Sequence, residues 1–293
     1  MTNQPLVSVI CLCYNHANYV IEALNSVINQ SYKNVELIVV DDCSSDNSLQ
    51  LIKDWNLSHN ILFIKNETNL GPTKAFNIAL KQTKGEYIVD LAADDLLTHK
   101  SIEERVKTFE SSTHQNLGIV FSNVESIDNN GNHIEYRYPI DKNGKAINQP
   151  KTGDVYAELL STYYISASSM LIKKEVLDDL NGYDESLSYE DLDFWIRSSR
   201  NFTYDFTDAI LIKKRILKNS LGKQFYLKQG KHLAKSTYMV CKKALKLNRN
   251  KVEHRALINR LNYEIRLNIK VGNYAITLKF MRLYFTTLIK TWS

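Results

Sequence analysis

Two pairs of consecutive aspartates are the residues of this chain most suited to binding a metal ion. Asp41-Asp42 and Asp94-Asp95 each follow a short apolar run of the kind that forms a buried β-strand. Neighbouring carboxylates repel each other unless a cation compensates their charge, whereas a single Asp beside a helix start usually caps that helix. We therefore interpret Asp94-Asp95 as a cation site and Asp46, which precedes a predicted helix, as a cap.

The apolar runs before these pairs alternate with helical patterns along the first 95 residues. The predicted strands are short and rich in β-branched residues, and they span 6–13, 35–40, 61–65 and 86–91. Strand–helix alternation of this kind predicts a mainly parallel sheet flanked by helices. Ligands of such sheets bind beyond the carboxyl ends of the strands, which is where both aspartate pairs are expected.

The turn after the first predicted strand, LCYNHANY, contains no glycine. Dehydrogenases and P-loop enzymes share the strand–helix alternation but bind phosphates with a glycine-rich turn at this point. The sequence therefore argues against both classes. A divalent cation can bridge a diphosphate instead, with only one or two protein oxygens as ligands. We predict Mn²⁺ or Mg²⁺ as the cofactor.

Five segments resemble, in order and at the usual spacing, the motifs of the family-2 glycosyltransferases with the GT-A fold. They are SVICLCYN, ELIVVDDCSSDNS, NLGPTKAFNIAL, GEYIVDLAADD and GYDESLSYEDLDFWIR, within residues 5–215. The resemblance implies a mixed, mainly parallel GT-A sheet and inverting transfer from a nucleotide-sugar donor, most often a UDP-sugar, to an acceptor hydroxyl. It further implies an enzyme of the capsule or O-antigen type, acting on a glycan or a lipid-linked glycan acceptor.

The resemblance implies roles for four residues in donor binding. Tyr14 and the main chain near Leu12 would contact the nucleobase, Asp42 would hydrogen-bond it, and Lys74 would contact the donor. The chain departs from the family pattern at Phe76, where an arginine is usual. No nucleobase contact is therefore expected from the helix that carries Phe76.

The resemblance also assigns the second aspartate pair. Asp94 would meet the ribose, and Asp95 would bind the metal on the diphosphate. Ala92 stands where the family often has a further aspartate, and no histidine follows the last predicted strand. We therefore expect a metal held by Asp95, the diphosphate and water, with Lys214 or Arg215 sharing the phosphate charge.

Asp191, in the segment EDLDFW, is the implied catalytic base. Direct inversion needs one carboxylate to accept the proton of the attacking hydroxyl. If residues 191–200 are helical, Asp191 lies one turn before Trp195 on the same face. An indole there would partly desolvate the carboxylate and make it a better base. Glu190 is interpreted as a supporting residue, and the alternative is that both acids only favour the helix dipole.

The charge of the 293-residue chain is distributed unevenly. Residues 1–212 contain 17 Lys and Arg against 30 Asp and Glu, whereas residues 213–293 contain 20 against 2. We predict a GT-A catalytic domain at 1–220, with a nucleotide-binding half (1–95) and an acceptor half (96–220), and a basic helical region at 221–293. The basic region is interpreted either as a solvated surface or as a surface for an anionic membrane; nucleic acid is not expected.

Cysteine spacing and the amino terminus predict a cytoplasmic protein. The four cysteines form no CxxC pair, and the amino-terminal apolar run is too short for a signal peptide or a membrane span. An anionic membrane partner would place the protein at the inner face of the cell membrane. Two other functions stay open: a catalytically inactive sugar-nucleotide-binding or scaffold module, and a nucleotidyltransferase, although the glycine- and arginine-rich first turn of the latter is missing.

Overall fold

The computed structural model describes residues 4–217 and 221–292. The described residues form two compact units. The sheet unit comprises 4–153, 166–183 and 202–216, and the helical unit comprises 154–165, 184–201, 217 and 221–292. The segments of the two units alternate along the chain. The domain boundary between residues 220 and 221 remains a prediction.

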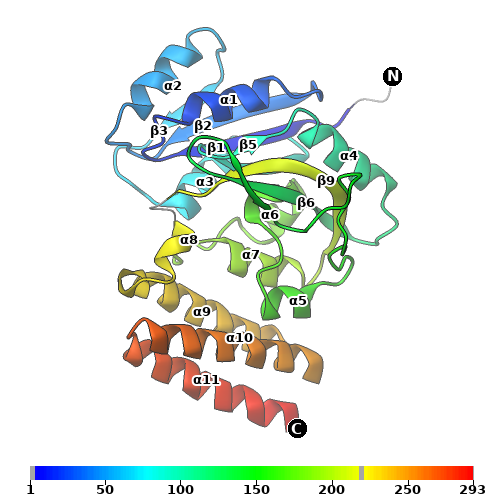
Figure 1. Cartoon of the computed structure of the whole chain (residues 1–293), viewed down its shortest axis with the longest axis vertical. Coiled ribbons are helices and arrows are strands. Elements are labelled where there is room, and N and C mark those ends of the chain that lie inside the picture. Colours follow the sequence, from blue (N-terminus) through cyan, green and yellow to red (C-terminus); the bar gives the residue numbers. More distant parts are fainter. Residues whose placement is uncertain (1–3, 218–220, 293) are drawn as a thin grey trace. The chain divides into compact units, whose positions relative to one another are not determined.

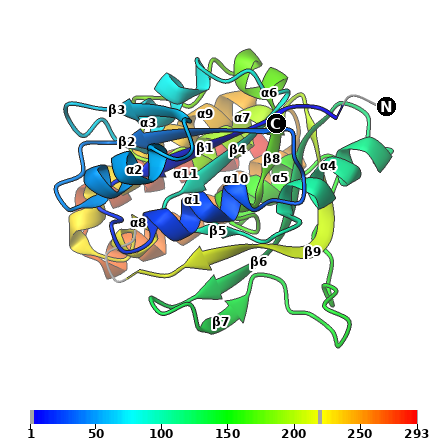
Figure 2. The same ribbon diagram turned by 90° about the horizontal axis from the view of Figure 1, so that it is seen from above.

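Within the described residues, the sheet unit contains one nine-stranded sheet in the order β3-β2-β1-β4-β8-β6-β9-β5, with β7 paired to β6 (Figures 1 and 2). The strands are β1 (Val7–Cys13), β2 (Val35–Asp41), β3 (Leu62–Lys65), β4 (Tyr87–Ala92), β5 (Leu96–Leu97), β6 (Leu117–Ile127), β7 (His133–Tyr136), β8 (Leu171–Lys173) and β9 (Thr203–Arg215). Strands β3, β2, β1 and β4 are parallel, as are β6 and β9. Strand β8 runs antiparallel to both β4 and β6, so the sheet is mixed, as predicted.

Helices cover the sheet because its central strands are apolar on both faces (Figures 1 and 2). The helices of the sheet unit are α1 (Val20–Ile28), α2 (Ser48–Asn56), α3 (Pro72–Leu80), α4 (Ser101–Ser111) and α6 (Lys174–Asp179). Leu24 of α1 and Val106 of α4 join one core cluster with Cys11 of β1 and Leu91 of β4. Cys11 is fully buried, and all four cysteines are free thiols.

Strand β8 is short and follows a 3₁₀ turn. Of residues 166–174, only Leu171–Lys173 forms a strand, and Ala167–Ser169 forms a single 3₁₀ turn. The strand is short because it pairs at only two positions with each of its neighbours, β4 and β6.

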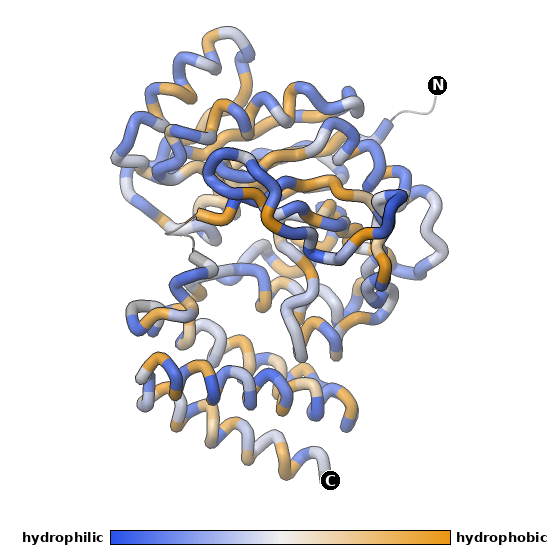
Figure 3. Tube along the Cα trace, in the orientation of Figure 1, coloured by the Kyte–Doolittle hydropathy of each residue, from blue (hydrophilic) through white to orange (hydrophobic). Residues whose placement is uncertain are grey.

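The described part of the helical unit contains only helices and loops. Its elements are α5 (Tyr156–Ser161), α7 (Asp191–Ser198), α8 (Leu221–Gln224), α9 (Lys231–Leu247), α10 (Lys251–Lys270) and α11 (Tyr274–Trp292). Helices α9, α10 and α11 pack against one another, which confirms the expected basic helical region. Figure 3 shows apolar and polar residues alternating along them. In the described ranges, no helix is both long enough and apolar enough to cross a membrane.

Candidate active site

The carboxyl ends of β1, β2 and β4 form the edge at which the predicted donor-binding residues meet. Cys13 of β1 pairs with Asp41 of β2, and Leu12 pairs with Ala92 of β4, so the three strands end together. The backbone continues this alignment, because the Asp42 amide donates to the Cys13 carbonyl at 2.9 Å. We call this edge the donor rim.

Tyr14 is the exposed aromatic residue of the donor rim. Its side chain is 46% exposed, and it follows β1 directly. The next residue, Asn15, adopts a left-handed conformation with φ of 59°. Its Oδ1 accepts a hydrogen bond from the Ser45 amide at 2.7 Å. The loop after β1 is thereby fixed to the loop after β2, which leaves the Tyr14 ring free to contact a ligand.

Asp46 belongs to this loop scaffold. Its two carboxylate oxygens accept from the amides of Ala17 and Ser48, each at 2.9 Å. The Asp46 carboxylate therefore binds the start of α2, as a capping residue does, and also the loop that leads to α1.

Asp42 is buried and anchors the segment before α3. Its carboxylate accepts from Asn66 Nδ2 at 2.8 Å, from the Leu70 amide at 2.9 Å and from the Gly71 amide at 2.8 Å. Lys74, in the first turn of α3, is exposed. The structure thus places Asp42 at the rim, with most of its hydrogen-bonding capacity already used by the protein.

The Asp94-Asp95 pair follows β4 and carries crowded negative charge. Asp95 is 3% exposed, and its Oδ1 accepts from the Arg215 amide at 2.9 Å. Burial, followed by the charge of Asp94, raises the pKa of Asp95 to about 7. Burial also raises the pKa of Asp94, against the opposing charges of Lys214 and Arg215. A bound cation would relieve the repulsion that the two carboxylates share.

Arg215 is buried and binds several groups of the protein. Its side chain is 2% exposed, and the guanidinium binds Glu22 at 2.9 Å and three backbone carbonyls, one of them that of Asp94 at 3.2 Å. The side chain also lies over the Tyr19 ring. Most donors of Arg215 are thus used inside the protein, and the expectation that Lys214 or Arg215 shares the charge of a phosphate remains a prediction. Lys214 is only half-buried.

The residues of the rim fit a cation that takes few protein ligands. In the part of the chain that the structure describes, no three His, Cys, Asp or Glu side chains are grouped as a metal site. His16 Nδ1, however, is buried without a hydrogen-bond partner and lies 3.8 Å from Asp94 Oδ1. Burial lowers the pKa of His16, which favours the neutral ring. An electron-pair acceptor such as a metal ion would suit this group of atoms.

Asp191 begins helix α7 in the helical unit. The predicted helix is present, so Asp191 lies one turn before Trp195, as expected. Asp191 Oδ1 accepts from the Leu192 amide at 2.7 Å, and Glu190 occupies the N-cap position. Trp195 is 1% exposed, with its ring centroid 5.7 Å from that of Tyr163. The catalytic role of Asp191 and the supporting role of Glu190 remain predictions.

A buried polar cluster adjoins Asp191 within the helical unit. The hydroxyls of Tyr163 and Tyr189 lie 3.4 Å apart. Burial is the main cause of the raised pKa of both tyrosines, and the charge of Asp191 contributes to each. Arg260 of α10 lies 4.2 Å from the centre of the Tyr163 ring and donates to the Leu160 carbonyl at 3.2 Å.

Comparison with known proteins identifies the family. A model described as glycosyl transferase family 2 matches residues 8–180. The chain belongs to glycosyl transferase family 2. Relatives of this family-2 glycosyltransferase include an uncharacterized glycosyltransferase of Methanocaldococcus jannaschii, 34% identical over 219 residues that cover 73% of this chain and 72% of the relative. Another, from Rickettsia typhi, is 32% identical over 216 residues, 73% of this chain and 65% of the relative.

Solved structures show the GT-A fold for this glycosyltransferase. The crystal structure of Staphylococcus aureus TarS 1–349 in complex with UDP-GlcNAc superposes with a TM-score of 0.65 at 19% identity, covering 96% of this chain and 90% of that one. The mannosyltransferase PcManGT from Pyrobaculum calidifontis, in complex with GDP-Man and Mn²⁺, superposes with a TM-score of 0.60 at 16% identity, covering 99% and 84%. These likenesses confirm the predicted fold class.

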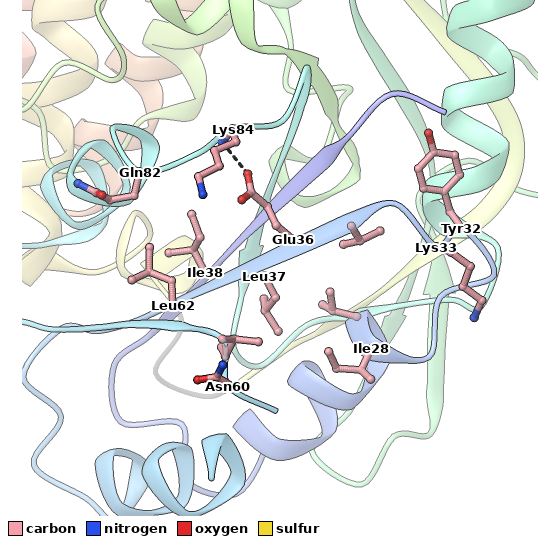
Figure 4. A pocket seen from close by; sticks show the side chains of 13 residues that line it. Ile28, Tyr32, Lys33, Glu36, Leu37, Ile38, Asn60, Leu62, Gln82 and Lys84 are labelled. Atoms are coloured by element: carbon pink, nitrogen blue, oxygen red, sulfur yellow. Dashed lines mark hydrogen bonds between the residues drawn. The ribbon is translucent and has the colours of Figure 1, made fainter. Parts of the chain in front are cut away.

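A cavity of about 540 Å³ in the glycosyltransferase lies away from the donor rim (Figure 4). It is lined by the first residues of β2 and β3 and by Gln82 and Lys84, so it opens at the amino ends of the parallel strands. Glu36 in this cavity accepts from the Lys84 amide at 2.6 Å. None of the predicted site residues lines it, and open α/β sheets bind ligands at the opposite edge.

Sequence reasoning missed several residues of the donor rim and of the polar cluster beside Asp191. His16 stands in the quoted turn LCYNHANY, so its position after the first strand was a usable signal. Tyr163 and Arg260 carry no such signal, because their partners Tyr189 and Leu160 lie far away in the sequence. Phe76, which replaces the usual arginine, is fully buried and stacks on Tyr183 with ring centroids 4.3 Å apart.

Proposed function

We propose that this glycosyltransferase moves a sugar, with inversion, from a nucleoside diphosphate sugar to an acceptor hydroxyl. The observation that carries the proposal is the donor rim, where three strand ends bring an exposed tyrosine and an aspartate pair to one edge. The donor is proposed to be a UDP-sugar, supported by the UDP and UDP-GlcNAc named in the TarS complexes. The GDP-Man named with PcManGT makes guanosine the alternative base.

The donor rim would hold the nucleotide through five residues. The Tyr14 ring, exposed at the strand end, would stack on the base. The main chain near Leu12 and the remaining acceptor capacity of Asp42 would bind the base edge. Lys74 is exposed in the first turn of α3, so its ammonium group would contact the donor. Asp94 would hydrogen-bond the ribose.

Asp95 would hold a divalent metal, Mn²⁺ or Mg²⁺, together with oxygens of the diphosphate and water. Such an ion would neutralise the charge that develops on the departing diphosphate. The residues fit this role because burial raises the pKa of both Asp94 and Asp95, so their negative charge is only partly compensated, and because His16 Nδ1 has no hydrogen-bond partner among the described residues. Lys214, whose charge acts on both carboxylates, would contribute to the same neutralisation.

Asp191 would act as the general base. The acceptor oxygen would form a bond to the anomeric carbon while the bond from that carbon to the diphosphate oxygen breaks. The nucleoside diphosphate would leave with the electron pair, and the hydroxyl proton would pass to the Asp191 carboxylate. Glu190, at the N-cap of α7, would support its position, and the buried Trp195 would reduce the hydration of the site.

The proposed acceptor is a glycan or lipid-linked glycan, as in capsule or O-antigen synthesis. An acceptor of this kind would place the enzyme in the cytoplasm at the inner face of the cell membrane. The basic charge of residues 213–293 supports a membrane partner, and nucleic acid is not proposed as a partner.

The test measures nucleotide release from a panel of UDP-sugars and GDP-mannose, with and without glycan acceptors. Asp191→Asn is nearly isosteric, so it should leave donor affinity intact while transfer falls by about 10²–10⁴-fold. Glu190→Gln should lower transfer less. A rate near that of the wild type for Asp191→Asn would exclude Asp191 as the base.

Asp95→Ala tests the metal site independently of turnover. It should abolish the Mn²⁺-dependent increase in UDP affinity, as measured by calorimetry, whereas Asp179→Ala, at an exposed residue of α6, should not. A wild-type response to Mn²⁺ in Asp95→Ala would contradict the proposed ligand. Donor binding with no transfer to any acceptor would favour the inactive sugar-nucleotide-binding module instead.

A further inference from the structure

The described surface of α10 and α11 is basic without acidic compensation from the same helices. Residues 213–293 contain only two acidic residues, Glu253 and Glu264. Both are buried, at 7% and 3% exposure. Glu253 pairs with Arg200 at 3.1 Å, and Glu264 lies 3.7 Å from Arg260. The folded chain therefore removes both negative charges from the surface of these helices and leaves lysines and arginines exposed.

Helix α11 also exposes a stripe of large apolar side chains. Four of them are more than half exposed: Tyr274 at 67%, Leu278 at 60%, Phe285 at 62% and Ile289 at 71%. At 3.6 residues per turn, the four fall within about 60° of the helix circumference. We call them the α11 stripe.

The α11 stripe is not the packing face of the helix. That face consists of buried residues such as Phe280 and Leu283, at 0% and 7% exposure. Helix α11 thus has two apolar faces, of which one packs in the helical unit and the other lies on its surface. Exposed Arg282 lies beside the stripe, about 20° from Ile289 around the helix, and exposed Lys279 lies between the stripe and the packing face. The combination of large apolar side chains and basic residues on one helix face is typical of helices that lie in a membrane interface.

Two other partners fit the stripe less well. A second copy of the chain, packed face to face, would bring two basic surfaces without acidic residues together, and this repulsion would oppose association. A nucleic acid would use the basic residues and stack on aromatic rings, but it would leave the aliphatic Leu278 and Ile289 exposed to water. An anionic bilayer accommodates both features, because its headgroups attract the cations and its acyl region takes the apolar side chains.

We propose that the α11 stripe inserts into the interface of an anionic bilayer, with the exposed basic residues of α10 and α11 on the headgroups. The inference deepens the proposed function, since a membrane surface is where a lipid-linked acceptor would be met. It predicts two separable contributions to binding. The attraction of the cations is screened by salt over about 8 Å at physiological ionic strength, whereas insertion of the stripe is not.

Vesicle co-sedimentation of the full-length protein tests both contributions, with phosphatidylglycerol vesicles compared against phosphatidylcholine. The protein should bind the anionic vesicles far more strongly. The double variant Leu278→Ser, Phe285→Ser should lower the partition coefficient by at least about tenfold, with most of the residual binding lost in high salt. The double variant Lys279→Gln, Arg282→Gln should reduce vesicle binding strongly at low salt and only slightly at high salt. Leu57→Ser is the matched control, because Leu57 is an apolar residue of the sheet unit with 86% exposure.

Insertion itself is measured with Phe285→Trp and brominated phosphatidylglycerol. Quenching of the added tryptophan, beyond that of the wild type, supports insertion, and Leu57→Trp should show none. Absence of quenching at residue 285, or vesicle binding by the Leu278→Ser, Phe285→Ser variant equal to that of the wild type, overturns the proposal. The proposal is also overturned if the wild-type protein forms a dimer and the Leu278→Ser, Phe285→Ser variant does not. It is overturned as well if RNA displaces the wild-type protein from vesicles but does not displace this variant. UDP binding, which needs no vesicle, reports separately on the proposed function.

Discussion

Replacement of Asp42 tests how the donor rim is held together. The carboxylate is 5% exposed and accepts from Asn66 Nδ2, the Leu70 amide and the Gly71 amide, at 2.8, 2.9 and 2.8 Å. Gly71 has a second acceptor, Asn69 Oδ1 at 3.0 Å. Asp42→Ala would therefore leave two donors without an acceptor, those of Asn66 and Leu70, rather than three.

The expected loss of unfolding free energy follows from these two donors. Each buried donor that loses its acceptor costs about 1–3 kcal/mol, so Asp42→Ala should lower the free energy of unfolding by about 2–6 kcal/mol. Asp42→Asn keeps one oxygen for Asn66 and Leu70 and loses the charge-assisted bond to Gly71, which costs about 1–3 kcal/mol. At about 3 °C per kcal/mol, the thermal midpoint should fall by roughly 6–18 °C for Ala and 3–9 °C for Asn.

The assay is thermal unfolding of the full-length protein, with UDP affinity measured well below the midpoint. Asp54→Asn is the control, because the Asp54 carboxylate is exposed and accepts a hydrogen bond from Gln50, on the same helix, at 2.8 Å. The free energy of unfolding of this variant should stay within about 0.5 kcal/mol of the wild type. If Asp42→Asn unfolds at the wild-type thermal midpoint but loses UDP affinity, the carboxylate binds the nucleobase and does not stabilise the donor rim. That result would refute the reasoning.

Two further changes test packing and burial. Gly182 has φ of 73°, and a Cβ there would lie 2.4 Å from Asn77 Oδ1, whereas Gly131 has φ of 85° and a Cβ there would meet nothing within 4 Å. Gly182→Ala should therefore lower the free energy of unfolding more than Gly131→Ala does. Equal losses in chemical denaturation would exclude the clash with Asn77. Burial raises the pKa of Glu264 from 4.5 to about 7, so ionisation opposes folding, and this carboxyl's contribution to stability is greatest below pH 4.5 and falls as the pH rises towards 7. The unfolding free energy of the wild type relative to Glu264→Gln should therefore fall by up to about 3 kcal/mol over that range, and a pH-independent difference would contradict the shifted pKa.

Local patterns determined much of the sheet unit and of the donor rim. Short apolar runs predict β1, β2 and β4, and turn residues directly after them predict where Tyr14, Asp42 and Asp94 lie. These features depend on neighbours in the sequence, and parallel strands necessarily end at a common edge. The start of α7 at Asp191 was predictable for the same reason, since acidic residues precede an apolar helical stripe.

Burial and long-range pairing were decided only by the tertiary structure. Arg215 stands in a run of basic residues, yet it is buried because Glu22, 193 positions away in the sequence, and several backbone carbonyls accept its donors. Glu264 is also buried, although its ion-pair partner Arg260 lies one turn away on the same helix, so its burial depends on how α10 packs in the helical unit. The sequence of α11 shows apolar residues at helical spacing, among them Leu278 and Phe285, but periodicity cannot tell which of two apolar faces will pack. That choice depends on the surfaces that α9 and α10 present, and these exist only in the folded chain.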